Sequence, residues 1–189
     1  MFGVRLAGLR IFLALALLFG SDSAFAEVEV TFYSHELGDS FPHAFFTTKG
    51  TIEATGAAVD DNYGFTASAV SPAILFGSVN GKMDKATPKY IKSSDVRFSL
   101  TVSDADYAKL MTVIEQWAAH PQKNYNLNRR NCIHFVMEAA EILGLKVNRQ
   151  SKFFKKPRSF LEEVKSLNPE LQQVPESMQE SVTAPVPAA

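Results

Sequence analysis

The chain has 189 residues, with 19 basic and 20 acidic side chains and a formal net charge of −1 at pH 7. This balance gives no support for nucleic-acid binding, which usually needs a strongly basic surface. The single cysteine excludes an intramolecular disulfide, and no C-x₂-C or H-x₃-H spacing indicates a zinc site. We expect neither a metal nor a cofactor.

The first 26 residues have the pattern of a signal peptide. Arg5 and Arg10 precede an apolar core from Ile11 to Gly20, and the small residues Ala24 and Ala26 suit cleavage after Ala26. This core is shorter than the roughly 20 residues of a membrane-spanning helix. We expect a periplasmic or secreted protein without a transmembrane span after cleavage, and an uncleaved N-terminal anchor is the alternative.

Four segments after the signal peptide have the pattern of β-strands. Residues 27–34 (EVEVTFYS) alternate polar and apolar side chains, and 43–48 (HAFFTT) are aromatic and β-branched. Residues 62–70 (NYGFTASAV) form a weaker strand-like run. Residues 96–102 (VRFSLTV) alternate most regularly, which predicts a half-buried antiparallel strand.

Two amphipathic helices follow the strands. The first has Ser103 as its N-cap and ends before Pro121, and its apolar residues, Trp117 among them, are expected to lie in the core. The second has Asn131 as its N-cap and stops at Gly144. Strands followed by helices predict an α+β domain in which an antiparallel sheet packs against helices.

The predicted domain covers residues 27–164, a length that suits one hydrophobic core. Residues 165–189 are rich in Pro, Gln, Glu, Ser and Ala and lack an apolar period, which predicts a disordered tail. The basic stretch 149–158 (RQSKFFKKPR) favours a solvated loop whose Phe153 and Phe154 pack on the domain. Contact with an anionic envelope polymer or with lipid headgroups is the alternative.

Cys132 is unusual because exported proteins generally pair their cysteines. An odd thiol is either reactive or intermolecular, or it is a buried and inert side chain that acts as a small hydrophobic group. Cys132 falls in the first turn of the second helix, on the buried-facing stripe that Phe135, Val136, Ala139, Ala140 and Leu143 continue. There the backbone N–H groups and the helix dipole can lower a cysteine pKa and can hold an oxyanion. This position favours a nucleophile.

A thiolate nucleophile needs a base, and the chain offers four histidines. His134 lies two residues after Cys132 on one helix, so the two side chains point about 200° apart. His120 stands at a helix end, where a solvated histidine is the ordinary outcome. His43 opens an aromatic strand directly after a proline and is the preferred base, with His35 as the alternative.

Three motifs carry a resemblance to a known superfamily: HAFF from His43, NYGF from Asn62, and YNLNRRNCIHFV over 125–136. They resemble the circularly permuted papain-like cysteine hydrolases, which include NlpC-type cell-wall peptidases and lecithin retinol acyltransferase-like enzymes. The resemblance spans about His43 to Val147. It implies a permuted papain-like fold in which Cys132 is the nucleophile and His43 is its base.

The same superfamily usually has a third polar group that orients the histidine. Asn62 is the candidate, because its side-chain oxygen can accept a hydrogen bond from the imidazole N–H. A simple turn residue is the alternative for Asn62, and Asn80 is a more distant option.

Four further residues are candidates for substrate binding. Tyr63 and Tyr125 could line a groove, or they could be buried packing residues. Arg129 and Arg130 directly precede the cysteine helix and could meet substrate carboxylates, or they could be solvated.

Two functions follow from these observations. The favoured one is a thiol enzyme that forms an acyl-enzyme at Cys132 and acts as an amidase, peptidase or acyltransferase on an envelope peptide, amide or acyl lipid. The alternative is a noncatalytic domain of the same fold that binds an envelope component or a partner protein, because one fold can serve both functions.

Overall fold

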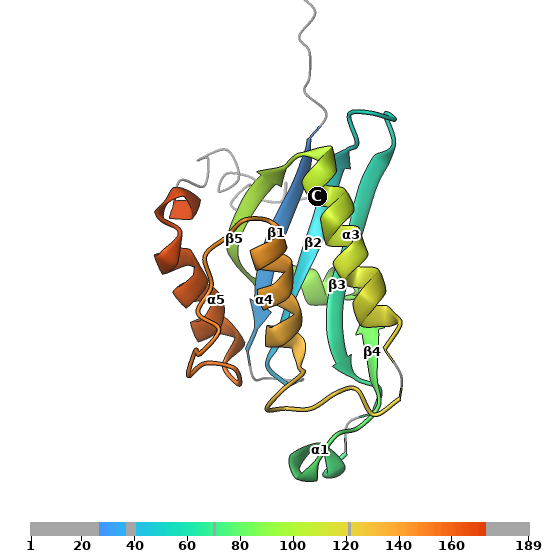
Figure 1. The fold of residues 1–189 in the computed structure, drawn as a ribbon, viewed down its shortest axis with the longest axis vertical. Coiled ribbons are helices and arrows are strands. Elements are labelled where there is room, and N and C mark those ends of the chain that lie inside the picture. Colours follow the sequence, from blue (N-terminus) through green and yellow to red (C-terminus); the bar gives the residue numbers. More distant parts are fainter. Residues whose placement is uncertain (1–26, 37–40, 70, 121, 173–189) are drawn as a thin grey trace, which may run out of the picture.

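A five-stranded antiparallel sheet carries three main helices on one face (Figure 1). The computed structural model describes residues 27–36, 41–69, 71–120 and 122–172. The strands are β1 (Val28–His35), β2 (His43–Thr51), β3 (Ala58–Ala67), β4 (Gly81–Asp84) and β5 (Asp95–Val102), in the order β4-β3-β2-β1-β5. The helices are α1 (Ala73–Phe76), α2 (Pro88–Lys92), α3 (Asp104–Ala118), α4 (Cys132–Ile142) and α5 (Pro157–Leu167), followed by the 3₁₀ turn η1 (Pro169–Gln172). The predicted α+β class is confirmed.

All four predicted strands are present, and the largest difference lies in β3. This strand begins at Ala58, four residues before the predicted start, because these four residues pair with Thr48–Thr51 at the end of β2. Strand β4 was not predicted. Its four residues pair with the end of β3 and are too few to show a clear alternation.

An aromatic layer fills the space between the sheet and the helices. Phe32 of β1 contacts Phe46 of β2 in a tilted arrangement and stacks on Phe98 of β5, with ring centroids 5.5 and 4.8 Å apart. Phe135 of α4 stacks on Phe46 at 5.4 Å and meets Trp117 of α3 at 5.3 Å. Trp117 is therefore a core residue, as predicted, and these rings tie α3 and α4 to the centre of the sheet.

The two predicted helices begin at their predicted caps. Ser103 Oγ accepts a hydrogen bond from the backbone N–H of Asp106 at the start of α3. Asn131 Oδ1 accepts from the first-turn N–H groups of α4. Gly144 follows the end of α4 with φ +85°, a left-handed conformation that glycine adopts without a Cβ clash.

Helix α5 was not predicted, and it carries the domain beyond residue 164. It begins at Pro157, which suits a first helical turn, and it buries Phe160, Leu161 and Val164. Leu171 of η1 is also buried. The described domain therefore runs to residue 172. The predicted signal peptide and residues 173–189 of the predicted tail lie outside the described residues, and within the described ones no helix is long and apolar enough to cross a membrane.

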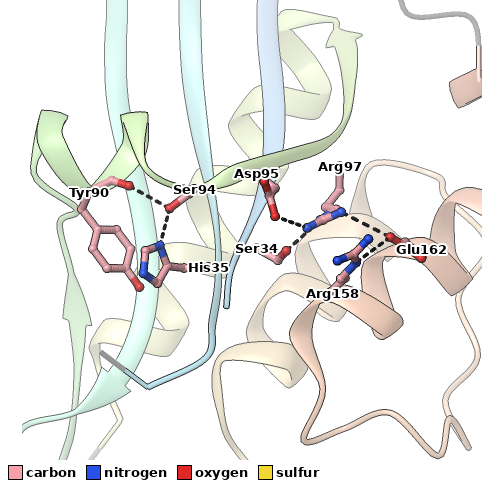
Figure 2. Close-up of polar contacts among 8 residues, drawn as sticks. All are labelled: Ser34, His35, Tyr90, Ser94, Asp95, Arg97, Arg158 and Glu162. Carbon is pink, nitrogen blue, oxygen red and sulfur yellow. Dashed lines mark hydrogen bonds and ion pairs between the residues drawn. The ribbon is translucent and has the colours of Figure 1, made fainter. Parts of the chain in front are cut away.

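Helix α5 is fixed to the sheet through Arg97, which lies at a bulge between β5 and β1. The bulge directs Arg97 to the helix-covered face. There its Nε donates to Ser34 Oγ at 2.7 Å, and its terminal nitrogens pair with Asp95 and Glu162 (Figure 2). Arg158 pairs with Glu162 at 3.1 Å. Because three groups satisfy a guanidinium that is only 10% exposed, the start of α5 is held against the edge of the sheet.

Candidate functional site

Cys132 is the first residue of α4 and is 6% exposed. The preceding Asn131 forms a capping box: its side chain accepts from the N–H groups of Ile133 at 2.9 Å and His134 at 3.3 Å, and its own N–H donates to His134 Nδ1. The Asn131 amide also donates to two carbonyls of neighbouring loops. Two of the first-turn N–H groups that could hold an oxyanion, those of Ile133 and His134, are thus already bonded to Asn131.

The thiol of Cys132 faces the backbone at the start of β2. Burial raises its pKa to about 11 from 9.0, although the backbone N–H groups of Ala44 and Ile133 hydrogen-bond to the sulfur and favour the thiolate. The prediction that the helix N-terminus lowers the cysteine pKa is wrong at this position. The loss of hydration on burial raises this pKa more than the backbone N–H groups lower it. The thiol is protonated at neutral pH.

His43 is the first residue of β2, and its side chain lies on the face of the sheet away from α4. Successive residues of a strand point to opposite faces, and Ala44 points into the core beneath α4. His43 instead stacks on Phe45 at 6.0 Å and lies against Gly64, where a Cβ would come 2.6 Å from its Nε2. The structure therefore brings the backbone next to His43 close to Cys132, but it does not bring the imidazole to the thiol.

Successive side chains of the neighbouring strand β1 also point to opposite faces of the sheet (Figure 2). Ser34 points to the side of α5, whereas His35 points to the other side and stacks on Tyr90 of α2 at 4.3 Å. His35 and His43 lie directly opposite each other across β1 and β2, so they share the outer face. The sheet separates the alternative base, His35, from Cys132 as well.

The surroundings of His43 keep its imidazole neutral. Burial lowers its pKa to about 4, with an opposing contribution from the carboxylate of Asp84 and a smaller lowering from His35. A neutral imidazole could act as a base, but here it lies among aromatic side chains of the outer face. Its position fits a packing role at the end of the sheet.

Asn62 and Tyr63 do not join Cys132. Asn62 Oδ1 accepts from the backbone N–H of Ala86 at 2.6 Å, and its Nδ2 donates to the Ala86 carbonyl at 3.2 Å, so this side chain holds the loop after β4. Tyr63 is buried in the core with its hydroxyl 3.7 Å from Met111 Sδ. Asn80 is also engaged elsewhere, since its Oδ1 accepts from a backbone N–H of the loop before α4.

The remaining three candidates have different positions. Tyr125 is buried beside Cys132, and burial together with that thiol raises its pKa. Arg129 is exposed. The Arg130 guanidinium lies 3.6 Å from the centroid of the Trp117 ring, with Nε and one Nη buried and without a hydrogen-bond partner in the described structure. Arg130 thus contributes a cation–π contact. Of the three residues, only Tyr125 lines a cleft, and Cys132 lines the same cleft.

This cleft has a volume of about 580 Å³, and Cys132 is one of the residues that line it. Its walls come from the loop before β2, the end of β3, the α1 segment, and the loops before α4 and α5. Most lining side chains are apolar, among them Phe41, Leu75, Leu127 and Phe154. Of the described residues that line it, Lys155 is the only one with a charge. The cleft is therefore suited to an apolar group, with one cation on its wall.

The chemistry beside the sulfur is limited. The β2 residue that faces Cys132 is Ala44, and its partner across β1 is Ser34, whose hydroxyl accepts from Arg97. Neither residue is a base. In the described part of the chain, no group of three His, Cys, Asp or Glu side chains could hold a metal ion. Sequence reasoning missed Ala44 and the α1 wall, because small side chains and a four-residue helix give no pattern that marks a site.

Comparison with known proteins adds no assignment. No family model, no curated protein and no solved structure matches the chain. What is established is an α+β fold with a five-stranded antiparallel sheet.

Proposed function

We propose that this domain binds the apolar part of an envelope ligand in the cleft, and that Cys132 belongs to the binding surface rather than acting as a nucleophile. One observation carries the proposal: a largely apolar cleft is lined by a thiol of raised pKa, and this thiol faces Ala44 where a base would be required. A protonated thiol is a small hydrophobic group and a weak hydrogen-bond donor, which suits the wall of an apolar site.

The proposal keeps the permuted papain-like fold as its framework. Two features support it: Cys132 heads a helix, and that helix packs at its start against the strand that begins HAFF. These are the motifs that carry the resemblance. In this view the chain is a noncatalytic domain of that fold, in which Ala44 occupies the position facing the thiol.

The thiol enzyme is the second candidate, because Cys132 lines the cleft and an acyl group bound there would lie beside its sulfur. This function also requires a base. The start of β2 would have to turn so that the His43 imidazole reaches the helix-covered face. The imidazole would take the thiol proton and give it to the leaving amine or alcohol as the acyl group bonds to the sulfur. Water or another acceptor would then take the acyl group from the sulfur and restore the thiol.

A neutral apolar probe tests the binding proposal. N-phenyl-1-naphthylamine should fluoresce on binding to residues 27–189. Ser71→Trp should weaken binding at least tenfold, because Ser71 is exposed on the cleft wall and a large ring there fills the cleft. Ser93→Trp is the matched control, since Ser93 is exposed on the C-cap of α2 outside the cleft, and it should change binding less than twofold. Equal effects of the two substitutions would contradict the proposal.

Mass spectrometry separates the two candidates. With muropeptides, acyl amides and short acyl lipids, we expect no covalent adduct on Cys132 and no turnover. Cys132→Ser should bind the probe within about threefold of the unmodified chain, because the two side chains are close in size. An adduct on Cys132, with turnover that disappears in Cys132→Ser, would establish the enzyme instead.

A further inference from the structure

Three large apolar side chains are exposed on the wall of the cleft or directly next to it in the chain. Phe41 is 66% exposed, Leu75 is 74% exposed and Phe76 is 88% exposed. Phe41 and Leu75 line the cleft itself, and Phe76 follows Leu75 in α1. Single exposed apolar residues are common on proteins, but three large ones around one opening form a surface that usually has a partner.

The α1 segment is anchored so that these side chains project outward. It extends from one end of the molecule, beyond the sheet (Figure 1). Ile74 packs against the core, and Val79 forms a two-way backbone bridge with Tyr125, with both N···O distances 2.9 Å. Leu75 and Phe76 lie between these two anchors, so their exposure is built into the fold.

Cations lie next to this apolar surface. Lys155 lines the cleft with Phe41 and Leu75, and Lys152 and Lys156 are exposed in the same loop. None of the three lysines forms an ion pair with a described residue. Arg158 differs, because it pairs with Glu162. Lys152 Nζ lies 5.3 Å from the centroid of the Phe153 ring, but no described carboxylate neutralises any of the three charges.

We propose that this end of the molecule docks on an anionic lipid bilayer, with Phe41, Leu75 and Phe76 entering the interface and Lys152, Lys155 and Lys156 meeting the headgroups. Apolar tips combined with adjacent lysines are what an interfacial binding site needs. A soluble protein partner would explain the apolar side chains, but the adjoining unpaired cations match a negatively charged surface better. Docking would place the mouth of the cleft at the bilayer, and it does not depend on what the cleft binds.

Vesicle flotation tests the proposal with residues 27–189, which include every described residue. The chain should float with vesicles that contain phosphatidylglycerol and much less with phosphatidylcholine vesicles, and 0.5 M salt should weaken the binding. Leu75→Ser combined with Phe76→Ser should lower the partition coefficient at least tenfold. Val96→Ser combined with Ile142→Ser is the matched control at exposed apolar positions outside the cleft, and it should change partitioning less than twofold.

A second pair of variants tests the charges. Each lysine near an anionic surface contributes about a fivefold effect on binding, so Lys155→Gln with Lys156→Gln should weaken partitioning at least tenfold. Lys49→Gln with Lys146→Gln is the control, because Lys49 lies at the other end of β2 and Lys146 follows the far end of α4. All the substituted positions are exposed, so thermal melting should stay unchanged.

Three outcomes would overturn the proposal. The first is no flotation with anionic vesicles. The second is flotation that Leu75→Ser with Phe76→Ser leaves unchanged. The third is concentration-dependent dimerisation, seen by analytical ultracentrifugation without lipid, that the same variant abolishes while vesicle binding is absent. In that case a second copy of the chain covers the surface.

Discussion

Cys132 should react with iodoacetamide about a hundredfold more slowly than an exposed cysteine at pH 8. The thiolate is the reacting species. With a pKa of about 11, roughly 0.1% of the thiol is ionised at pH 8, against roughly 9% at the ordinary value of 9.0. His43→Ala should leave this rate within about twofold, because the imidazole lies on the other face of the sheet.

The assay follows adduct mass on the folded protein between pH 6 and pH 10. Cys132→Ser provides the blank, and Ser166→Cys in that background provides an exposed reference thiol on α5. The logarithm of the rate for Cys132 should rise through pH 10 without a plateau. Fast alkylation at pH 6 that is lost in His43→Ala would refute this reasoning and would restore the Cys132–His43 pair.

Three stability predictions follow. Gly64→Ala should destabilise the fold by about 1–3 kcal/mol in urea unfolding, because the added Cβ would lie 2.6 Å from His43 Nε2. Gly77→Ala is the control and should be near neutral, because a Cβ added there would have no neighbouring atom of the described structure within 4 Å. Stability should fall as the pH decreases from 6.5 towards 4, by up to about 3 kcal/mol, because the unfolded chain binds a proton at His43 before the folded chain does. A pH dependence unchanged in His43→Gln would contradict this assignment. Asn131→Ala should lower the free energy of unfolding by about 2–4 kcal/mol, since it removes a helix cap and leaves two loop carbonyls without their donor. A decrease below about 1 kcal/mol would mean that water replaces these hydrogen bonds.

The sheet and two helices could be predicted because their signals are local. Alternation marked β1 and β5, and aromatic and β-branched residues marked β2, whereas the signal for β3 was weaker. Ser103 and Asn131 marked the starts of α3 and α4 through cap chemistry that depends on a few neighbouring residues. Helix α5 was missed although Pro157 and the apolar spacing of Phe160 and Val164 were present, because the basic run before it suggested a loop. Strand β4 and helices α1 and α2 are too short for a period to appear.

The position of Cys132 could be predicted, but its partner could not. A helix start and an apolar stripe place the thiol on the buried side of α4, and this was correct. The side of the sheet on which His43 lies depends on whether the odd-numbered or the even-numbered residues of β2 face the helices. Phe45 and Phe46 follow each other and are both buried, one on each face, so the apolar residues of HAFF do not reveal which set faces the helices.

The register of β2 therefore decides between a binding site and a thiol enzyme. A slip of one residue would turn His43 towards α4, but it would also move all the remaining side chains of the strand to the opposite face. Phe46 would leave its contacts with Phe32 and Phe135, and Phe45 would leave Tyr33, on which it stacks at 5.0 Å. Exposing one such ring costs about 1.5–3 kcal/mol. Aromatic contacts on both faces thus oppose a slip of the whole strand, so an active pair would need a local turn at the first residue of β2, where pairing ends.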